Sequence, residues 1–282
     1  MTATSPPPGT AELMSRITAE LSTRLAAVGR GRGRPGPPVL VAVAHGSRDP
    51  EAVRTVRALL TAVRELRPGL PVRLGHVELN EPLLRDTLGT LRGDAVLVPL
   101  LFGRGHHVTK DIPDLLREAT LRTAGGPPPP LSARIAAPLG PHPLLAAALA
   151  ARLAEAGWRD GDGVVLAAAG SRAARSAADT EATAALLAAR LGVPVLPAYA
   201  SAAAPTVAEA ARVLAARGCR RIGVACCFTA PGLFARRTAA DARALGLPAA
   251  APLGAHPALA RLVLHRYDEQ LAALRTATRT AA

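Results

Sequence analysis

Histidines beside two glycine-containing segments are the residues of this 282-residue sequence whose type and spacing could support chemistry. His45 directly follows one apolar segment, and His106 and His107 follow a later one. A carboxylate, Glu78 or Glu81, lies between them in the sequence. Two imidazoles and a carboxylate can hold a divalent metal ion and leave coordination positions open. Since a neutral imidazole can also accept a proton near neutral pH, we predict a site for metal binding or proton transfer.

The remaining histidines that we interpret are expected to be structural. His142 and His256 each precede a proline at the start of a predicted helix, where such a residue can cap the helix. His76 lies within a predicted strand and is expected to be packed. His106 and His107 compete for the site, because neighbours on a loop rarely both face one ion. The residue pattern leaves that choice open.

Alternating strands and helices are predicted to position these side chains. The predicted strands of the first part of the chain cover residues 39–44, 71–77, 94–101 and 132–139. Helices are predicted to begin at Asp49-Pro50, at Glu81-Pro82 and at Asp111, where cap oxygens, prolines and acidic residues favour a helix start. This alternation is typical of a doubly wound α/β domain, which binds ligands at the carboxyl ends of its strands.

The pattern occurs twice. Residues 137–145 (APLGPHPLL) match residues 251–259 (APLGAHPAL), and an apolar segment followed by Gly-Ser-Arg also recurs. We therefore predict two tandem doubly wound parallel-sheet α/β domains that face each other across a cleft. The predicted domains are residues 39–155, carrying the active site, and residues 156–282, a degenerate copy. Residues 1–38 are predicted to be an N-terminal extension and flexible linker.

The chemical groups occur in one copy only. Ala169 stands in the second copy where the first has His45, and Gly232-Leu233-Phe234 stands where the first has its histidine pair. The second copy also has no carboxylate at the position that corresponds to Glu78. The same scaffold therefore exists without these groups, which indicates that they serve function rather than folding.

Composition narrows the class of partner. The formal net charge is +13 and is carried almost wholly by arginine. Nucleic acid is the usual partner of such a charge, but aromatic residues make up only 2% of the chain, so stacking platforms are scarce. We expect no nucleic-acid partner and favour an anionic small molecule, because guanidinium groups pair well with carboxylates. No apolar run approaches the length of a membrane span, and we expect a cytoplasmic protein without membrane contact.

Several motifs together resemble the sirohydrochlorin chelatase family, the small class II chelatases. The first is Ala44-His-Gly-Ser-Arg48 after a strand, and the second is Glu78 with Glu81-Pro82. The third is Gly103-Arg-Gly-His-His107-Val-x-x-Asp-Ile-Pro113. The resemblance is close over residues 39–145 and weaker over 163–270. It implies chelatase-like domains in the long form of the family, with two tandem copies.

The family resemblance implies a lyase that inserts Fe²⁺ or Co²⁺ into sirohydrochlorin without ATP or an organic cofactor. Such a reaction serves sirohaem or cobalamin biosynthesis. The matching motif positions imply that His45 and His107 hold the metal and that both act in catalysis with Glu78. The alternative is a metal- or tetrapyrrole-binding protein without turnover. The choice between iron, cobalt and nickel stays open.

The substrate implied by the resemblance is an anionic tetrapyrrole. Arginines on the rim of the cleft would orient its carboxylates, and glycines would let the backbone approach the flat ring. Ser47 would contribute a hydroxyl or support its turn. We also expect a monomer, because the internal duplication replaces a dimer of short chains. The residues expected to bind the substrate are Ser47, Arg48, Gly103, Arg104 and Gly105.

Overall fold

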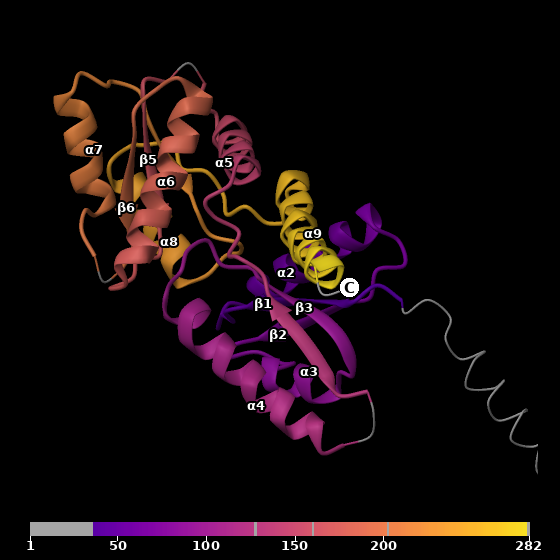
Figure 1. The fold of residues 1–282 in the computed structure, drawn as a ribbon. Coiled ribbons are helices and arrows are strands. Elements are labelled where there is room, and N and C mark those ends of the chain that lie inside the picture. Colours follow the sequence, from indigo (N-terminus) through magenta and orange to yellow (C-terminus); the bar gives the residue numbers. More distant parts are fainter. Residues whose placement is uncertain (1–35, 127–128, 160, 202, 281–282) are drawn as a thin grey trace, which may run out of the picture. The chain divides into compact units, whose positions relative to one another are not determined.

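The computed structural model describes residues 36–126, 129–159, 161–201 and 203–280. These residues form two parallel β-sheets with helices on both faces of each, so the predicted α/β class is confirmed (Figure 1). Both sheets belong to one compact unit that begins at Pro38. Except for its last three residues, the predicted extension of residues 1–38 lies outside the described residues.

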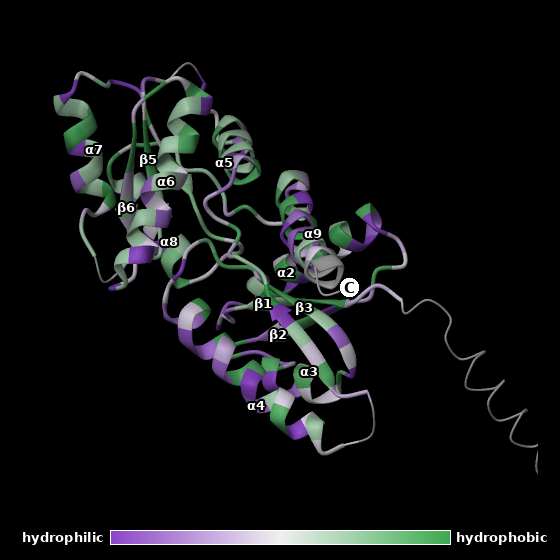
Figure 2. Ribbon diagram, viewed as in Figure 1, coloured by the Kyte–Doolittle hydropathy of each residue, from purple (hydrophilic) through white to green (hydrophobic). Residues whose placement is uncertain are grey.

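The first sheet has the strand order β2-β1-β3-β4, with all neighbours parallel. β1 is central and almost wholly buried, as its uniformly apolar sequence predicts. Apolar residues dominate the central strands in Figure 2. The strands are β1 (Val39–Ala44), β2 (Val72–His76), β3 (Gly93–Pro99) and β4 (Leu131–Ile135).

Helices connect these strands, and two of them begin as predicted, one at Pro50 after Asp49 and one at Ile112 after Asp111. Asp49 caps the first helix by accepting a hydrogen bond from the backbone N–H of Glu51 at 3.0 Å. The helix predicted to begin at Glu81-Pro82 begins two residues later, at Leu84, because the Pro82 carbonyl accepts from the His76 N–H and extends the β2 pairing. The helices are α2 (Pro50–Leu66), α3 (Leu84–Thr90), a π-helical turn η1 (His107–Asp111) and α4 (Ile112–Ala124).

The second sheet repeats the first with one strand fewer. Its order is β6-β5-β7, all parallel, and an isolated bridge between Val224 and Ala249 replaces the fourth strand. The strands are β5 (Gly163–Ala168), β6 (Val195–Tyr199) and β7 (Ile222–Cys226). The helices are α6 (Ala174–Leu191), α7 (Val207–Ala216) and α8 (Leu233–Ala244).

The last helix of each half packs on the other half. α5 (Pro143–Glu155) packs against α6 and β7, whereas α9 (Pro257–Thr280) packs against α2 and β3 (Figure 1). Tyr267 anchors α9 through its buried hydroxyl, which donates to the Pro38 carbonyl at 2.6 Å. The division into residues 39–155 and 156–282 remains a prediction. In the structure, each of these segments has one helix that packs on the sheet or helices of the other.

The exchanged helices create a shared core. One apolar cluster is continuous from β1 and α2 through α9 and α5 to β5 and β7. Two smaller clusters lie on the outer faces, one between the first sheet and α3 and α4, the other between the second sheet and α7 and α8. Cys226 and Cys227 are buried in the shared core, as their apolar strand predicts, and burial raises the pKa of the Cys226 thiol to about 12.

His142 and His256 are helix caps, as predicted. Nδ1 of His142 accepts from the Leu144 N–H at 3.0 Å, and Nδ1 of His256 accepts from the Ala258 N–H at 3.1 Å. Burial is the main cause that lowers the pKa of both imidazoles, and nearby arginines add to it. The folded protein therefore favours the neutral imidazoles that the caps require.

The caps predict a loss of stability in acid. Because the pKa of each imidazole is lower in the folded than in the unfolded chain, stability falls as the pH drops below 6.5, the ordinary value, toward the folded pKa. Asparagine caps helices well and does not titrate, so a His142→Asn/His256→Asn variant should lose less stability between pH 7.5 and 5.5. Urea unfolding at both pH values measures this, and equal losses in wild type and variant would contradict it.

Candidate metal-binding and active site

The predicted site residues lie at one edge of the first sheet. His45 follows β1, Glu78 follows β2, and His107 opens η1 after β3. Since β2, β1 and β3 are adjacent and parallel, their carboxyl ends bring the three side chains together.

The two imidazoles are in direct contact. The ring centroids of His45 and His107 are 4.4 Å apart, and the ring planes are nearly perpendicular at 86°. Nδ1 of His45 lies 3.1 Å from the Gly46 carbonyl oxygen, and Nδ1 of His107 lies 2.6 Å from Oδ2 of Asp111. A neutral imidazole that donates from Nδ1 keeps its Nε2 lone pair free. Each histidine therefore has one nitrogen available to a metal ion.

The structure brings Glu78 rather than Glu81 to this pair. Oε1 of Glu78 lies 3.6 Å from Nδ1 of His45, and both side chains are partly exposed. Glu81 instead accepts from the Leu83 N–H at 3.1 Å, just before α3. Glu78 is thus placed to exchange protons at the site, whereas Glu81 supports a helix start.

Asp111 orients His107, and sequence reasoning did not assign it this role. The π-helical turn places residues 107 and 111 next to each other, so the Asp111 carboxylate meets the His107 ring. Its other oxygen, Oδ1, lies 3.5 Å from Nε2 of His106, which is mostly exposed. When a carboxylate accepts from the ring nitrogen that does not bind the metal, it fixes the tautomer of the metal-binding histidine and raises its basicity. The spacing of His107 and Asp111 was a visible signal for this role.

We expect Asp111→Ala to weaken Co²⁺ binding ten- to hundredfold, roughly the effect of losing such a carboxylate. Asp111→Asn should lose less, because its amide oxygen still accepts from Nδ1. Titration of Co²⁺ by absorbance measures the affinity, and Asp114→Asn in the adjoining helix α4 is the control. Asp114 pairs with Lys110 and Arg117 instead of a histidine. Wild-type Co²⁺ affinity in Asp111→Ala would refute this role.

A cavity of about 950 Å³ opens beside the histidine pair. It is lined by both domains: the loops that follow β1, β2 and β3, and the loops that follow β5 and β7. The chain has three phenylalanines, and all of them line this cavity: Phe102, Phe228 and Phe234. Their placement at strand ends and at a helix start was a sequence signal that we missed. The walls suit a large, flat and mostly apolar ligand.

His76 is packed at the margin of this cavity. It is 1% exposed, and its Nδ1 lies 3.2 Å from the Pro82 carbonyl oxygen. Burial lowers the pKa of its imidazole. The prediction of a packed strand histidine is therefore confirmed.

Four of the five residues expected to bind substrate line the cavity: Ser47, Arg48, Gly103 and Gly105. Oγ of Ser47 accepts from the Asp49 N–H at 3.1 Å, so this hydroxyl supports its turn. A Cβ at Gly103 would lie 3.3 Å from Oγ of Ser176 in the second domain, a tight contact, whereas one at Gly105 would make an ordinary contact with Ser171 at 3.6 Å. Their role toward a substrate stays a prediction.

Arg104 is not among the residues that line the cavity. Its Nη2 lies 2.5 Å from Oδ1 of Asp179, and its Nε and backbone N–H both donate to Oδ2. Asp179 belongs to α6 of the second domain and is 2% exposed. Arg104 therefore links the two domains in this structure, and substrate binding by its guanidinium remains a prediction.

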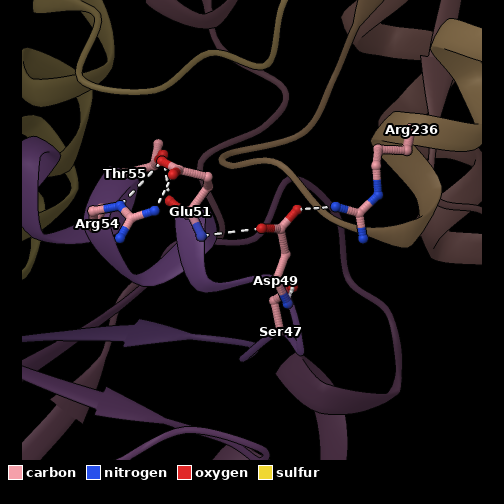
Figure 3. A network of polar contacts seen from close by, with 6 residues as sticks. All are labelled: Ser47, Asp49, Glu51, Arg54, Thr55 and Arg236. Carbon is pink, nitrogen blue, oxygen red and sulfur yellow. Dashed lines mark hydrogen bonds and ion pairs between the residues drawn. The ribbon is translucent and has the colours of Figure 1, made fainter.

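A second ion pair spans the domains on the cavity wall. Arg236 of α8 donates through Nη1 to Oδ2 of Asp49, the cap of α2 (Figure 3). Sequence reasoning missed both pairs, because the partners lie far apart in the sequence and no local pattern connects them.

Within the described residues, no group of three or more His, Cys, Asp or Glu side chains is arranged to hold a metal ion. The two free Nε2 atoms can supply two ligands, and the remaining positions must come from water or from another molecule in the cavity. Such a site can bind an ion and release it again. In the same described part of the chain, no helix combines the length and hydrophobicity that a membrane span requires.

The fold and the site together define a duplicated α/β protein with a histidine pair on one wall of an interdomain cavity. The CbiX family model matches residues 39–156 and again residues 163–270. The chain therefore belongs to the CbiX family, and both halves take part in the match.

Individual relatives agree with this membership. A sirohydrochlorin cobaltochelatase of Methanococcoides burtonii is 28% identical over 117 residues, which cover 38% of this chain and 87% of the relative. A chloroplastic sirohydrochlorin ferrochelatase of Arabidopsis thaliana is 34% identical over 113 residues, which cover 38% of this chain and 47% of the relative. The structure of SirB from Bacillus subtilis with Fe³⁺ aligns with a TM-score of 0.69 at 21% identity. It covers 83% of this chain and 95% of that chain, and the match shows the same fold.

Proposed function

We propose that this protein is a sirohydrochlorin chelatase, a lyase that inserts Fe²⁺ or Co²⁺ into sirohydrochlorin without ATP. Membership of the CbiX family supports this activity, as do the cobaltochelatase and ferrochelatase relatives. The product would enter sirohaem or cobalamin biosynthesis. The metal ion is a substrate, and the reaction needs no organic cofactor.

The observation that carries the proposal is the contact between His45 and His107, with both Nε2 atoms free. Neutral imidazole is a good ligand for both ions, and the two nitrogens can replace water molecules one at a time. Because the protein supplies few ligands, the pyrrole nitrogens can complete the coordination and then take the ion over. A closed site with four protein ligands would retain the metal instead.

Insertion also requires the loss of two pyrrole protons. Glu78 lies beside His45 and is half exposed, so its carboxylate can receive a proton and pass it to water. His45 itself can take up a proton once the ion has left its nitrogen. The single-copy occurrence of these groups supports one active site per chain.

The cavity fits the proposed macrocycle. Its phenylalanines offer apolar faces to a flat ring, and its exposed rim carries arginine for the carboxylates of sirohydrochlorin. We propose Ser47, Arg48, Gly103, Arg104 and Gly105 as residues near the substrate. Since two halves of one chain supply both walls, we propose a monomer. We also propose a cytoplasmic location, with which the free thiols of Cys219, Cys226 and Cys227 are consistent.

An insertion assay tests this function. The purified protein is mixed with excess metal-free sirohydrochlorin and with Co²⁺, Fe²⁺ or Ni²⁺ under anaerobic conditions, and the absorbance of the macrocycle is followed. We expect many product molecules per protein molecule for at least one ion. One equivalent of product or less would favour a binding protein without turnover.

A further inference from the structure

The cavity has one arginine side chain on each domain among the described residues that line it. Arg48 comes from the loop after β1, and Arg236 comes from α8. Both side chains are exposed. The second domain has no imidazole or carboxylate at its matching strand ends, so Arg236 is the charged group that it presents to the cavity.

The present partner of Arg236 is already engaged elsewhere. Oδ1 of Asp49 accepts from the Glu51 N–H at 3.0 Å, and the carboxylate is buried at the N-terminus of α2. The positive end of the helix dipole stabilises this negative charge without any arginine. The Glu51 N–H and the helix terminus therefore compensate part of the Asp49 charge without Arg236.

Arg236 is only partly satisfied. One nitrogen, Nη1, reaches Oδ2 of Asp49. The other guanidinium donors have no partner within the part of the chain that the structure describes, and Figure 3 shows them directed away from Asp49. Asp49 is buried, but the Arg236 side chain is exposed, so water can solvate the guanidinium when it leaves the carboxylate. The guanidinium can thus exchange its partner at low cost.

The other interdomain pair differs in this respect. Arg104 donates three hydrogen bonds to Asp179, from Nε, Nη2 and its backbone N–H, and it does not line the cavity. That pair is a complete link between the domains. The contrast indicates that the Arg236 contact serves something other than joining the two halves.

We infer that Arg236 binds a peripheral carboxylate of the tetrapyrrole, and that Asp49 competes for its guanidinium until the substrate arrives. This inference rests on the proposed function. A planar guanidinium donates two parallel hydrogen bonds to a carboxylate, and this arrangement is stronger than the single contact to Asp49. The degenerate domain would then orient the macrocycle over the histidine pair of the other domain.

Binding of metal-free sirohydrochlorin, followed by its fluorescence, tests the inference apart from catalysis. Arg236→Ala should raise the Kd about tenfold, the effect of losing a charged hydrogen-bonded pair. Arg237→Ala, which removes the exposed neighbouring arginine, should leave the Kd unchanged. Asp49→Asn keeps the helix cap but releases Arg236, so the Kd should fall about two- to fivefold.

Each outcome has a distinct meaning. An unchanged Kd in Arg236→Ala would overturn the inference while the proposed function stands. A similar rise in Kd in Arg236→Ala and Asp49→Asn would also overturn it, because the pair would then act only as a structural link. If the wild-type protein does not bind sirohydrochlorin, the proposed function fails and the inference with it.

A second variant covers the case in which Arg236→Ala does not fold, as judged by thermal unfolding. Arg236→Lys keeps the positive charge but loses the two-pronged geometry, and its Kd should rise about threefold. Wild-type affinity in this variant would then overturn the inference.

Discussion

Replacing His107 by alanine is expected to lower the rate of Co²⁺ insertion into sirohydrochlorin at least about a hundredfold, and His45→Ala should do the same. Each change removes one of the two free Nε2 atoms at the cavity wall. A single imidazole cannot hold the ion against the macrocycle. The double variant should be little worse than either single one, because the two rings act as a unit.

His106→Ala is the matched control for this prediction. Its ring is mostly exposed, and its centroid lies 6.4 Å from that of His107. We expect this variant to insert Co²⁺ at a rate within about threefold of the wild-type rate. It removes only the contact to Oδ1 of Asp111, the oxygen that does not face His107. Rates for His45→Ala and His107→Ala that equal the wild-type rate, after subtraction of the uncatalysed reaction, would refute the assignment of the site.

The second large effect is expected from Gly46→Ala. Gly46 has a φ of +110°, which disfavours any side chain, and a Cβ there would overlap the carbonyl oxygen of Glu78. The substitution must therefore move the backbone that presents Glu78 next to His45. A displacement of this kind can reduce activity roughly a hundredfold. The metal insertion assay measures the loss.

The duplicated fold supplies the control. Gly170 has a φ of +89°, and a Cβ there would overlap the carbonyl oxygen of Ser201 in the same way. Both variants should lower the free energy of unfolding by about 1–3 kcal/mol, but only Gly46→Ala should reduce activity per folded molecule. Equal activity losses would mean that general destabilisation causes the effect, rather than displacement of Glu78.

The strands of this fold could be predicted closely because local sequence defines them. β1 is a short apolar run between a proline-rich segment and a glycine-containing turn, and its observed bounds equal the predicted residues 39–44. The helix start at Asp49-Pro50 could also be predicted from local sequence, because the capping residue and the proline are neighbours. The helix expected at Glu81-Pro82 starts two residues later, because a strand contact holds Pro82 outside the helix.

Other parts of the site depend on contacts that periodicity does not encode. The π-helical turn that joins His107 to Asp111 departs from the 3.6-residue period by which helices are predicted. The sequence pattern also shows which face of α5 and α9 is apolar, but not which sheet covers that face. The pairs Arg104–Asp179 and Arg236–Asp49 follow from the docking of the two halves, so they became visible only in three dimensions.

The crossing of α5 and α9 has a consequence for how this chain can be shortened. A fragment that stops at residue 155 keeps both imidazoles but leaves the buried surface of α2 and β3 open to water, because Leu259, Leu262 and Val263 are gone. Such a fragment should aggregate or pair with a second copy of itself. The half that lacks the site histidines is therefore needed for stability, because its helix α9 covers apolar surface of the half that carries them.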